Sequence, residues 1–177
     1  LFFMIFANGL IFINPMIYKM FAAFLVEGSV SILSYSEKIY LLPVSVFLTT
    51  YAVAMFPNLS NLIANNEITN VNSMLKKSII FNIFISFVIF CIIYIFSLDI
   101  VNIFYSVANI KDTNIILISN VLDGYLLSLV FAGANSILLN LFFAHKWYNK
   151  LIYYSIFMLL MKISLNSIVV YFNYDVF

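Results

Sequence analysis

The sequence predicts an all-α, polytopic integral membrane protein with about five transmembrane helices. Of its 177 residues, 65% are hydrophobic and only 8% are charged, whereas soluble domains carry roughly 25% charged residues. The mean hydropathy is +1.11, and the apolar residues gather in stretches long enough for a helix to cross a bilayer. This composition excludes a water-soluble enzyme and a nucleic-acid-binding protein, because both need more charge.

Five apolar stretches qualify as membrane spans. They are residues 1–25, 30–57, 79–97, 114–144 and 151–172. The second and fourth exceed the minimum length, so we expect them to be tilted or to begin outside the hydrocarbon layer. Pro15 and Pro43 are candidate hinges, because proline inside a helix removes a hydrogen-bond donor and clashes one turn back. Because the chain opens on Leu1, already in an apolar stretch, we expect a piece of a longer protein.

Lysines are concentrated in two of the connecting segments, 58–78 and 145–150, with two in each. Connecting segments rich in lysine stay in the cytoplasm, so both are predicted to be cytoplasmic. Segment 58–78 also carries apolar residues at helical spacing and is predicted to form an amphipathic helix on the membrane surface. These residues are Leu59, Leu62, Ile63, Val71, Met74 and Leu75.

Two lysines lie deep in the predicted spans, where an ionisable group costs at least a few kcal/mol. Lys38 is eight residues into the second span, about 12 Å deep at 1.5 Å per residue. Lys162 is eleven residues from one end of the fifth span and ten from the other. Lys38 either extends to the interface or, as we expect, faces a polar interior or a ligand. We expect Lys162 to face a buried partner or a water-filled cavity, and Asn166 shares its helix face.

Three other ionisable residues are weaker candidates. Lys19, about 9 Å from the end of its helix, either extends to the interface or faces the cavity. Glu37 adjoins Lys38 but cannot face it on a helix. Asp123 either lies at the outer interface or serves as a counter-ion of Lys38 across a cavity.

Small and polar residues recur at every fourth position of the fourth span. In lipid, small residues let helix backbones approach closely, so this stripe is predicted to pack against neighbouring helices. It consists of Asn120, Gly124, Ser128, Ala132, Ser136 and Asn140, and a shorter version on the third span consists of Ser78, Asn82 and Ser86. A single histidine and a single cysteine, Cys91, indicate no metal site.

A family resemblance rests mainly on residues 14–60. The sequence Glu27-Gly28-Ser29, followed by Tyr35-Ser36-Glu37-Lys38-Ile39-Tyr40, Leu42-Pro43 and Phe56-Pro57-x-Leu59-Ser60, resembles the MurJ/MviN family. The preceding Asn14-x-x-Ile17-Tyr18-Lys19 is similar to the seventh-helix pattern of that family. These proteins are lipid II flippases of the multidrug/oligosaccharidyl-lipid/polysaccharide exporter superfamily, with two six-helix lobes and two further helices. The resemblance implies that residues 1–177 supply helices seven to eleven, most of the second lobe, and work with the first-lobe helices of the same protein.

The same resemblance implies a function. The protein would carry an undecaprenyl-diphosphate-linked glycan across the bacterial inner membrane by alternating access, in contact with membrane lipids and without making or breaking a covalent bond. Lys38 falls at the position of a cavity arginine of the family, which makes it the first candidate for binding the diphosphate. Lys19, Glu37 and Asp123 are the other candidates for the cavity.

Three positions depart from the sodium-binding members of the family. Tyr18 stands where those members have an aspartate. Lys162 stands where they have an asparagine, and Asn166 stands where they have an aspartate or an asparagine. These departures argue against sodium coupling, so no cofactor is expected. We hypothesise that the Lys162 ammonium takes the position that a sodium ion would occupy.

Three alternative functions differ from this one in the cargo or in the class of protein. The first is export of a capsule or O-antigen repeat unit on the same carrier lipid. The second, a membrane-embedded glycosyltransferase or phosphotransferase, would need clustered acidic residues that the sequence lacks. The third is a helix bundle without transport, against which the deep lysines argue, because a scaffold rarely keeps such costly groups.

Overall fold

The computed structural model describes residues 16–24, 27–105 and 112–172, and within these ranges the regular elements are helices, with no β-strand. Four stretches among the described residues are long and apolar enough to cross a membrane: Ser29–Ala64, Ile68–Ile95, Asn114–Ala144 and Tyr148–Ile168. The predicted all-α, polytopic membrane fold is therefore confirmed. The chain divides into two compact units, unit 1 (Leu1–Ser31 with Lys146–Phe177) and unit 2 (Ile32–His145).

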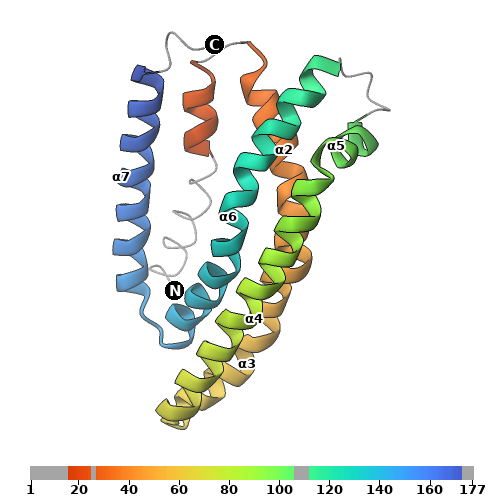
Figure 1. Cartoon of the computed structure of the whole chain (residues 1–177). Helices are drawn as coiled ribbons and strands as arrows, with labels where there is room; N and C mark the ends of the chain where they lie inside the picture. Colours follow the sequence, from red (N-terminus) through yellow and green to blue (C-terminus); the bar gives the residue numbers. More distant parts are fainter. Residues whose placement is uncertain (1–15, 25–26, 106–111, 173–177) are drawn as a thin grey trace. The chain divides into compact units, whose positions relative to one another are not determined.

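The stretch Ser29–Ala64 is 36 residues long. It consists of α2 (Ser29–Pro43), the π-helix η1 (Val44–Thr49) and α3 (Thr50–Ala64) (Figure 1). At 1.5 Å per residue it measures about 54 Å, well beyond the roughly 30 Å of the hydrocarbon layer. Part of it must therefore lie outside the hydrocarbon layer or be strongly tilted.

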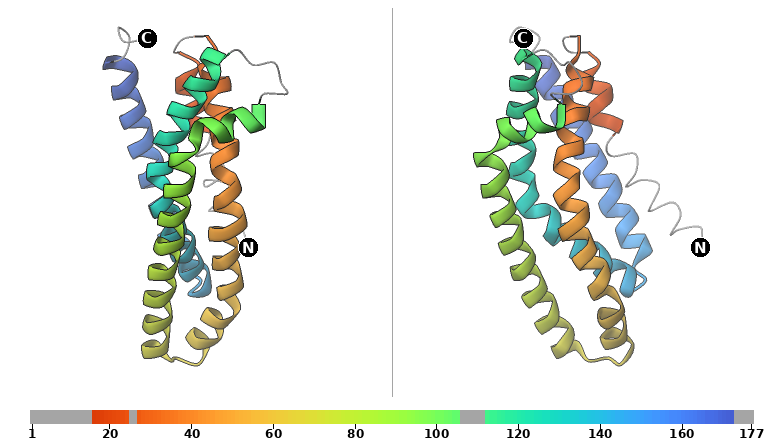
Figure 2. Two further views of the ribbon diagram at one scale, coloured as in Figure 1. Left: turned by 45° about the vertical axis from the view of Figure 1, so that its right-hand side comes forward. Right: turned by 90° about the vertical axis from the view of Figure 1, so that its right-hand side faces the viewer.

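Segment 58–78 differs from its prediction as a surface helix. It forms the end of α3, a turn and the beginning of α4 (Ile68–Ile95). In the turn, Asn66 has a φ of 57°, a left-handed conformation that asparagine tolerates. The apolar residues assigned to the membrane surface instead cover one another: Leu59 and Val71 are buried, and the others pack around them. These residues thus pack helix on helix, and Figure 2 shows α3 and α4 side by side.

α6 (Asp112–Ala144) is the central helix of unit 2 and contacts η1, α3, α4 and α5. Its buried residues recur at intervals of three and four, which places them on one face. They are Ile115, Ile118, Ser119, Leu122, Leu126, Leu129, Gly133 and Ile137. The core of unit 2 follows this face.

The predicted packing stripe of this helix is therefore corrected in part: Ser128 and Asn140 contact α2 and α3, but the stripe is not the buried face. Gly124 and Ser128 are exposed, and Ala132 and Ser136 are only half-buried. Among the described residues, a Cβ added to Gly124 would meet nothing within 4 Å. Large apolar side chains bury more area than small ones, so they determine which face of α6 packs. The buried glycine is Gly133, which lies outside the stripe.

A short helix follows α4. α5 (Ser97–Tyr105) lies between two predicted spans and turns across the end of α4 (Figure 2). Val101 is buried, and the hydroxyl oxygens of Ser97 and Ser119 lie 3.0 Å apart. An apolar contact and a polar contact thus help to hold α5 in unit 2.

Unit 1 contains α7 (Tyr148–Phe172) and the helix of residues 16–22. α7 begins three residues before the predicted fifth span, after a turn in which Lys146 has a φ of 56°. Most of the predicted first span, including the candidate hinge Pro15, lies outside the described residues.

The packing between α3 and α4 can be tested with Leu59→Ala. Leu59 is fully buried, so its truncation should lower the free energy of unfolding by roughly 2–5 kcal/mol. The measurement is thermal unfolding of the full-length protein in detergent. Asn58→Ala changes the exposed neighbour and should leave the unfolding temperature unchanged. Equal effects of the two substitutions would contradict the packed hairpin.

Candidate functional site

The first candidate, Lys38, lies on the part of α2 that faces away from the core of unit 2. Ser36 and Ile39 are buried, whereas Lys38 is exposed. It lies nine residues from Ser29, about 14 Å along the helix, inside a stretch that can span the membrane. Its Nζ lies 5.5 Å from the ring centroid of Tyr35, within the range of a cation–π interaction.

Two contacts fix the rotation of α2 against α6. The Ser36 hydroxyl donates to the backbone oxygen of Ile118 at 2.8 Å. Further along, the Tyr40 ring stacks on Tyr125 with a centroid distance of 5.5 Å, and its hydroxyl oxygen lies 3.1 Å from that of Ser128. Because these residues attach one side of α2 to α6, the Lys38 side is kept outside the helix contact.

α5 also contacts the Tyr35 ring. The Tyr105 hydroxyl donates to the backbone oxygen of Tyr35 at 3.0 Å, and the two ring centroids lie 4.7 Å apart at 56°. Burial, and to a smaller degree the neighbouring Tyr35, raise the pKa of Tyr105, so its hydroxyl stays protonated and able to donate. Tyr35 was not singled out from the sequence, although its three-residue spacing from Lys38 could have indicated the contact.

The two acidic candidates are both half-buried. Glu37 lies about 100° around α2 from Lys38. Asp123 lies about 160° around α6 from Tyr125, which faces α2, and among the described residues its Oδ1 is buried without a hydrogen-bond partner. Lys38 and Asp123 form no ion pair in the described part of the chain, so the counter-ion interpretation of Asp123 receives no support from this arrangement.

The remaining cavity candidates belong to unit 1. The Nζ of Lys19 lies 5.9 Å from the Tyr18 ring centroid. Lys162 and Asn166 are both half-buried, and the Asn166 amide donates to the backbone oxygen of Lys162 at 2.9 Å. The amide thus bonds to the backbone beside the lysine. Lys38 belongs to unit 2, so a cavity shared by Lys38 and Lys162 stays a prediction.

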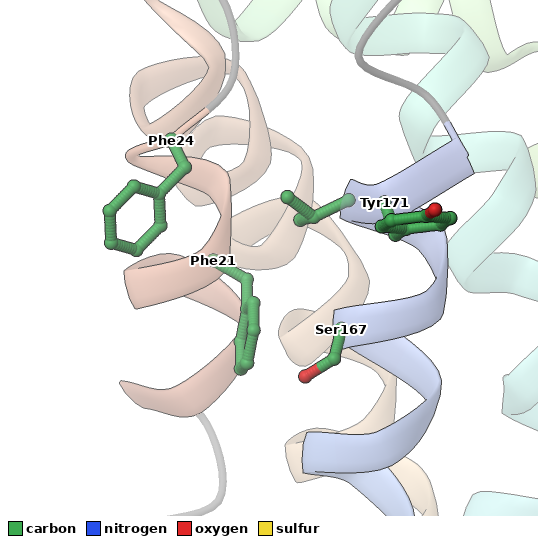
Figure 3. Close-up of a pocket in the computed structure, with 5 residues that line it drawn as sticks. Phe21, Phe24, Ser167 and Tyr171 are labelled. Atoms are coloured by element: carbon green, nitrogen blue, oxygen red, sulfur yellow. The ribbon is translucent and has the colours of Figure 1, made fainter.

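Unit 1 also has an open pocket of 520 Å³. It is lined by Phe21, Phe24, Ser167, Val170 and Tyr171, and Figure 3 shows the Phe21 ring and Ser167 pointing toward each other. The Ser167 hydroxyl donates to a backbone oxygen of its own helix. An apolar lining of this kind suits hydrocarbon and offers no charge to a diphosphate.

The candidate hinge Pro43 coincides with a change of helix type. Proline cannot donate to the preceding turn, and α2 gives way to the π-helix η1 directly after it. The Ser45 hydroxyl donates to the backbone oxygen of Leu42 at 3.0 Å, and the Thr50 hydroxyl donates to that of Ser45 at 2.8 Å. Side-chain hydroxyls thus bond to backbone oxygens around a locally widened turn, a feature often found at functional sites.

Polar residues also lie at the contact between α4 and α6. Ser78, Asn82 and Ser86 are buried on α4, which confirms the predicted packing of that shorter stripe. A Cβ added to Gly133 would clash with the Asn82 Oδ1. The Asn82 amide therefore fits here because residue 133 has no side chain. Among the described residues neither polar atom of the amide has a hydrogen-bond partner. Lower on α6, the Asn140 amide donates to the backbone oxygen of Ala52 in α3 at 2.6 Å.

A family model described as lipid II flippase MurJ matches residues 1–177. No curated protein and no solved structure matches the chain significantly.

The contact between Gly133 and Asn82 generates a stability prediction. Gly133→Ala should lower the free energy of unfolding by about 1–3 kcal/mol, because the new methyl group must displace a buried side chain. Thermal unfolding in detergent measures the effect, and the double variant Gly133→Ala with Asn82→Ala should recover most of it. Gly124→Ala, at a position with open space, should leave stability unchanged or raise it by up to about 1 kcal/mol. A harmless Gly133→Ala would contradict the close contact.

Proposed function

The chain belongs to the MurJ family of lipid II flippases, and on that premise we propose that it moves a lipid-linked glycan across the membrane by alternating access, with Lys38 binding the diphosphate. The family is one of transporters, and we propose on that ground that the chain serves multi-pass membrane transport and not catalysis. The undecaprenyl-diphosphate-linked cargo, the role of Lys38 and the bacterial inner membrane as the location are our proposals.

The observation that carries the proposal is the exposure of Lys38 inside a membrane-spanning stretch. An ammonium group facing hydrocarbon costs several kcal/mol, and the contacts of Ser36 and Tyr40 with α6 prevent α2 from rotating Lys38 into the core of unit 2. An exposed ammonium held in this place needs water or an anion. A diphosphate that crosses the membrane needs a cation that replaces its hydration.

The π-helical turn that follows Pro43 supports the alternating part of the proposal. α2 is attached to α6 above η1, and α3 is attached to α6 through Asn140 below it. A π-helical turn between two attached segments can change its hydrogen bonds at smaller cost than a regular α-helix. We infer that η1 is where the stretch bends when the access side changes.

Substitution of Lys38 tests the diphosphate contact. Lys38→Ala should reduce flipping of lipid II in vesicles by at least tenfold without lowering the unfolding temperature, since the side chain is exposed. Lys38→Arg should retain activity, because arginine keeps the charge and adds a bidentate donor.

Lys77→Ala is the matched control. It removes an exposed lysine at the beginning of α4 and should leave the rate unchanged. A Lys38→Ala variant that flips lipid II at the normal rate would contradict the proposed role of Lys38. If flipping of a capsule or O-antigen repeat unit depends on Lys38 and flipping of lipid II does not, the proposed cargo would be wrong and the role of Lys38 would stand.

The absence of sodium coupling is a second proposal. It is supported by Tyr18, Lys162 and Asn166 at the positions that ligate sodium in other members. We expect the flipping rate to be the same, within twofold, in sodium and in potassium buffers of equal ionic strength. Lys162→Asp should create sodium dependence if the ammonium occupies the place of the ion. A wild-type rate that rises with sodium concentration would refute this proposal while leaving the Lys38 contact intact.

A further inference from the structure

Three side chains form a connected series from α5 to the lysine on α2. The Tyr105 hydroxyl bonds to the backbone oxygen of Tyr35, the two rings are in contact, and the Tyr35 ring lies beneath the Lys38 ammonium. Tyr35 and Tyr105 are half-buried, whereas Lys38 is exposed. The series therefore runs from the packed part of unit 2 to a charged group outside the core.

A lysine side chain has many rotamers, and binding an anion with it costs the entropy of ordering it. The Tyr35 ring reduces this cost, because the attraction between the ammonium and the ring face restricts the position of Nζ before the anion arrives. The spacing of three residues on one helix brings the Tyr35 ring and the Lys38 side chain together locally.

Tyr105 in turn restricts the ring. Its own ring packs against that of Tyr35 at 4.7 Å, and its hydroxyl ties α5 to the backbone of α2 at the same residue. α5 is attached to α6 independently, by Ser97 and the buried Val101. These contacts of α5 thus hold Tyr105 in place beside Tyr35.

We propose that Tyr35, held in place by Tyr105, positions the Lys38 ammonium for the diphosphate group of the transported lipid. The inference rests on the proposed function and adds two positioning residues to it. Neither tyrosine needs to touch the diphosphate.

The test is a binding measurement on the full-length protein in detergent, with undecaprenyl diphosphate as the probe because it carries the diphosphate without a sugar. Tyr35→Leu should raise the Kd about fivefold, since the ring face is lost, whereas Tyr35→Phe keeps the ring and should stay within twofold. Tyr105→Phe removes only the hydroxyl and should raise the Kd about twofold to threefold. The control Tyr153→Leu, at an exposed tyrosine of α7, should have no effect.

The double variant separates positioning from a merely structural role. In a Lys38→Met background, Tyr35→Leu should change the Kd by less than twofold, because there is no ammonium left to position. An equal loss in both backgrounds, or an equal loss with Tyr35→Phe and Tyr35→Leu, would overturn the proposal. If Lys38→Met itself leaves the Kd unchanged, the proposed diphosphate contact fails. If Lys38→Met weakens binding and Tyr35→Leu does not, only the positioning role fails.

Discussion

The cost of an ammonium group in the hydrocarbon layer is the constraint on which the rest of this arrangement depends. Lys38 lies in a membrane-spanning stretch but outside the core of unit 2, so its charge must be compensated by water or by an anion. The contacts that attach α2 to α6 keep Lys38 in this position. Without the Ser36 bond and the Tyr40 stacking on Tyr125, α2 could rotate Lys38 toward the core of unit 2.

Two helices with contacts to the rest of unit 2 flank a π-helical turn in the stretch Ser29–Ala64. α2 is held at Ser36 and Tyr40, and α3 is held by Asn140 and by its packing against α4. The π-helix η1 lies between them, directly after Pro43. This order suits a transporter, because a bend concentrated in one turn lets two well-packed segments move without losing their own contacts.

The candidate site could be predicted from the sequence only where depth in the membrane decides the outcome. Lys38 could be singled out because the hydropathy profile alone places it inside a span; the structure shows it exposed, and its polar surrounding stays a prediction. Tyr105 could not be recognised, since it lies 70 residues from its partner Tyr35 and no local pattern connects them. Gly133 was missed for a related reason: a repeat of four residues marks small side chains but does not show which of them faces a neighbouring helix.

Hydropathy by itself determined that this chain is a helical membrane protein, because the transfer of apolar residues from water depends on their number and length of run, not on their partners. Only the tertiary structure decided which faces of the helices are buried. The apolar residues of segment 58–78 could lie on lipid or pack on one another with similar gain, and the turn at Asn66 brings them together. On α6, the large side chains spaced three and four apart outweighed the small-residue stripe, because burial depends on the helix that lies opposite.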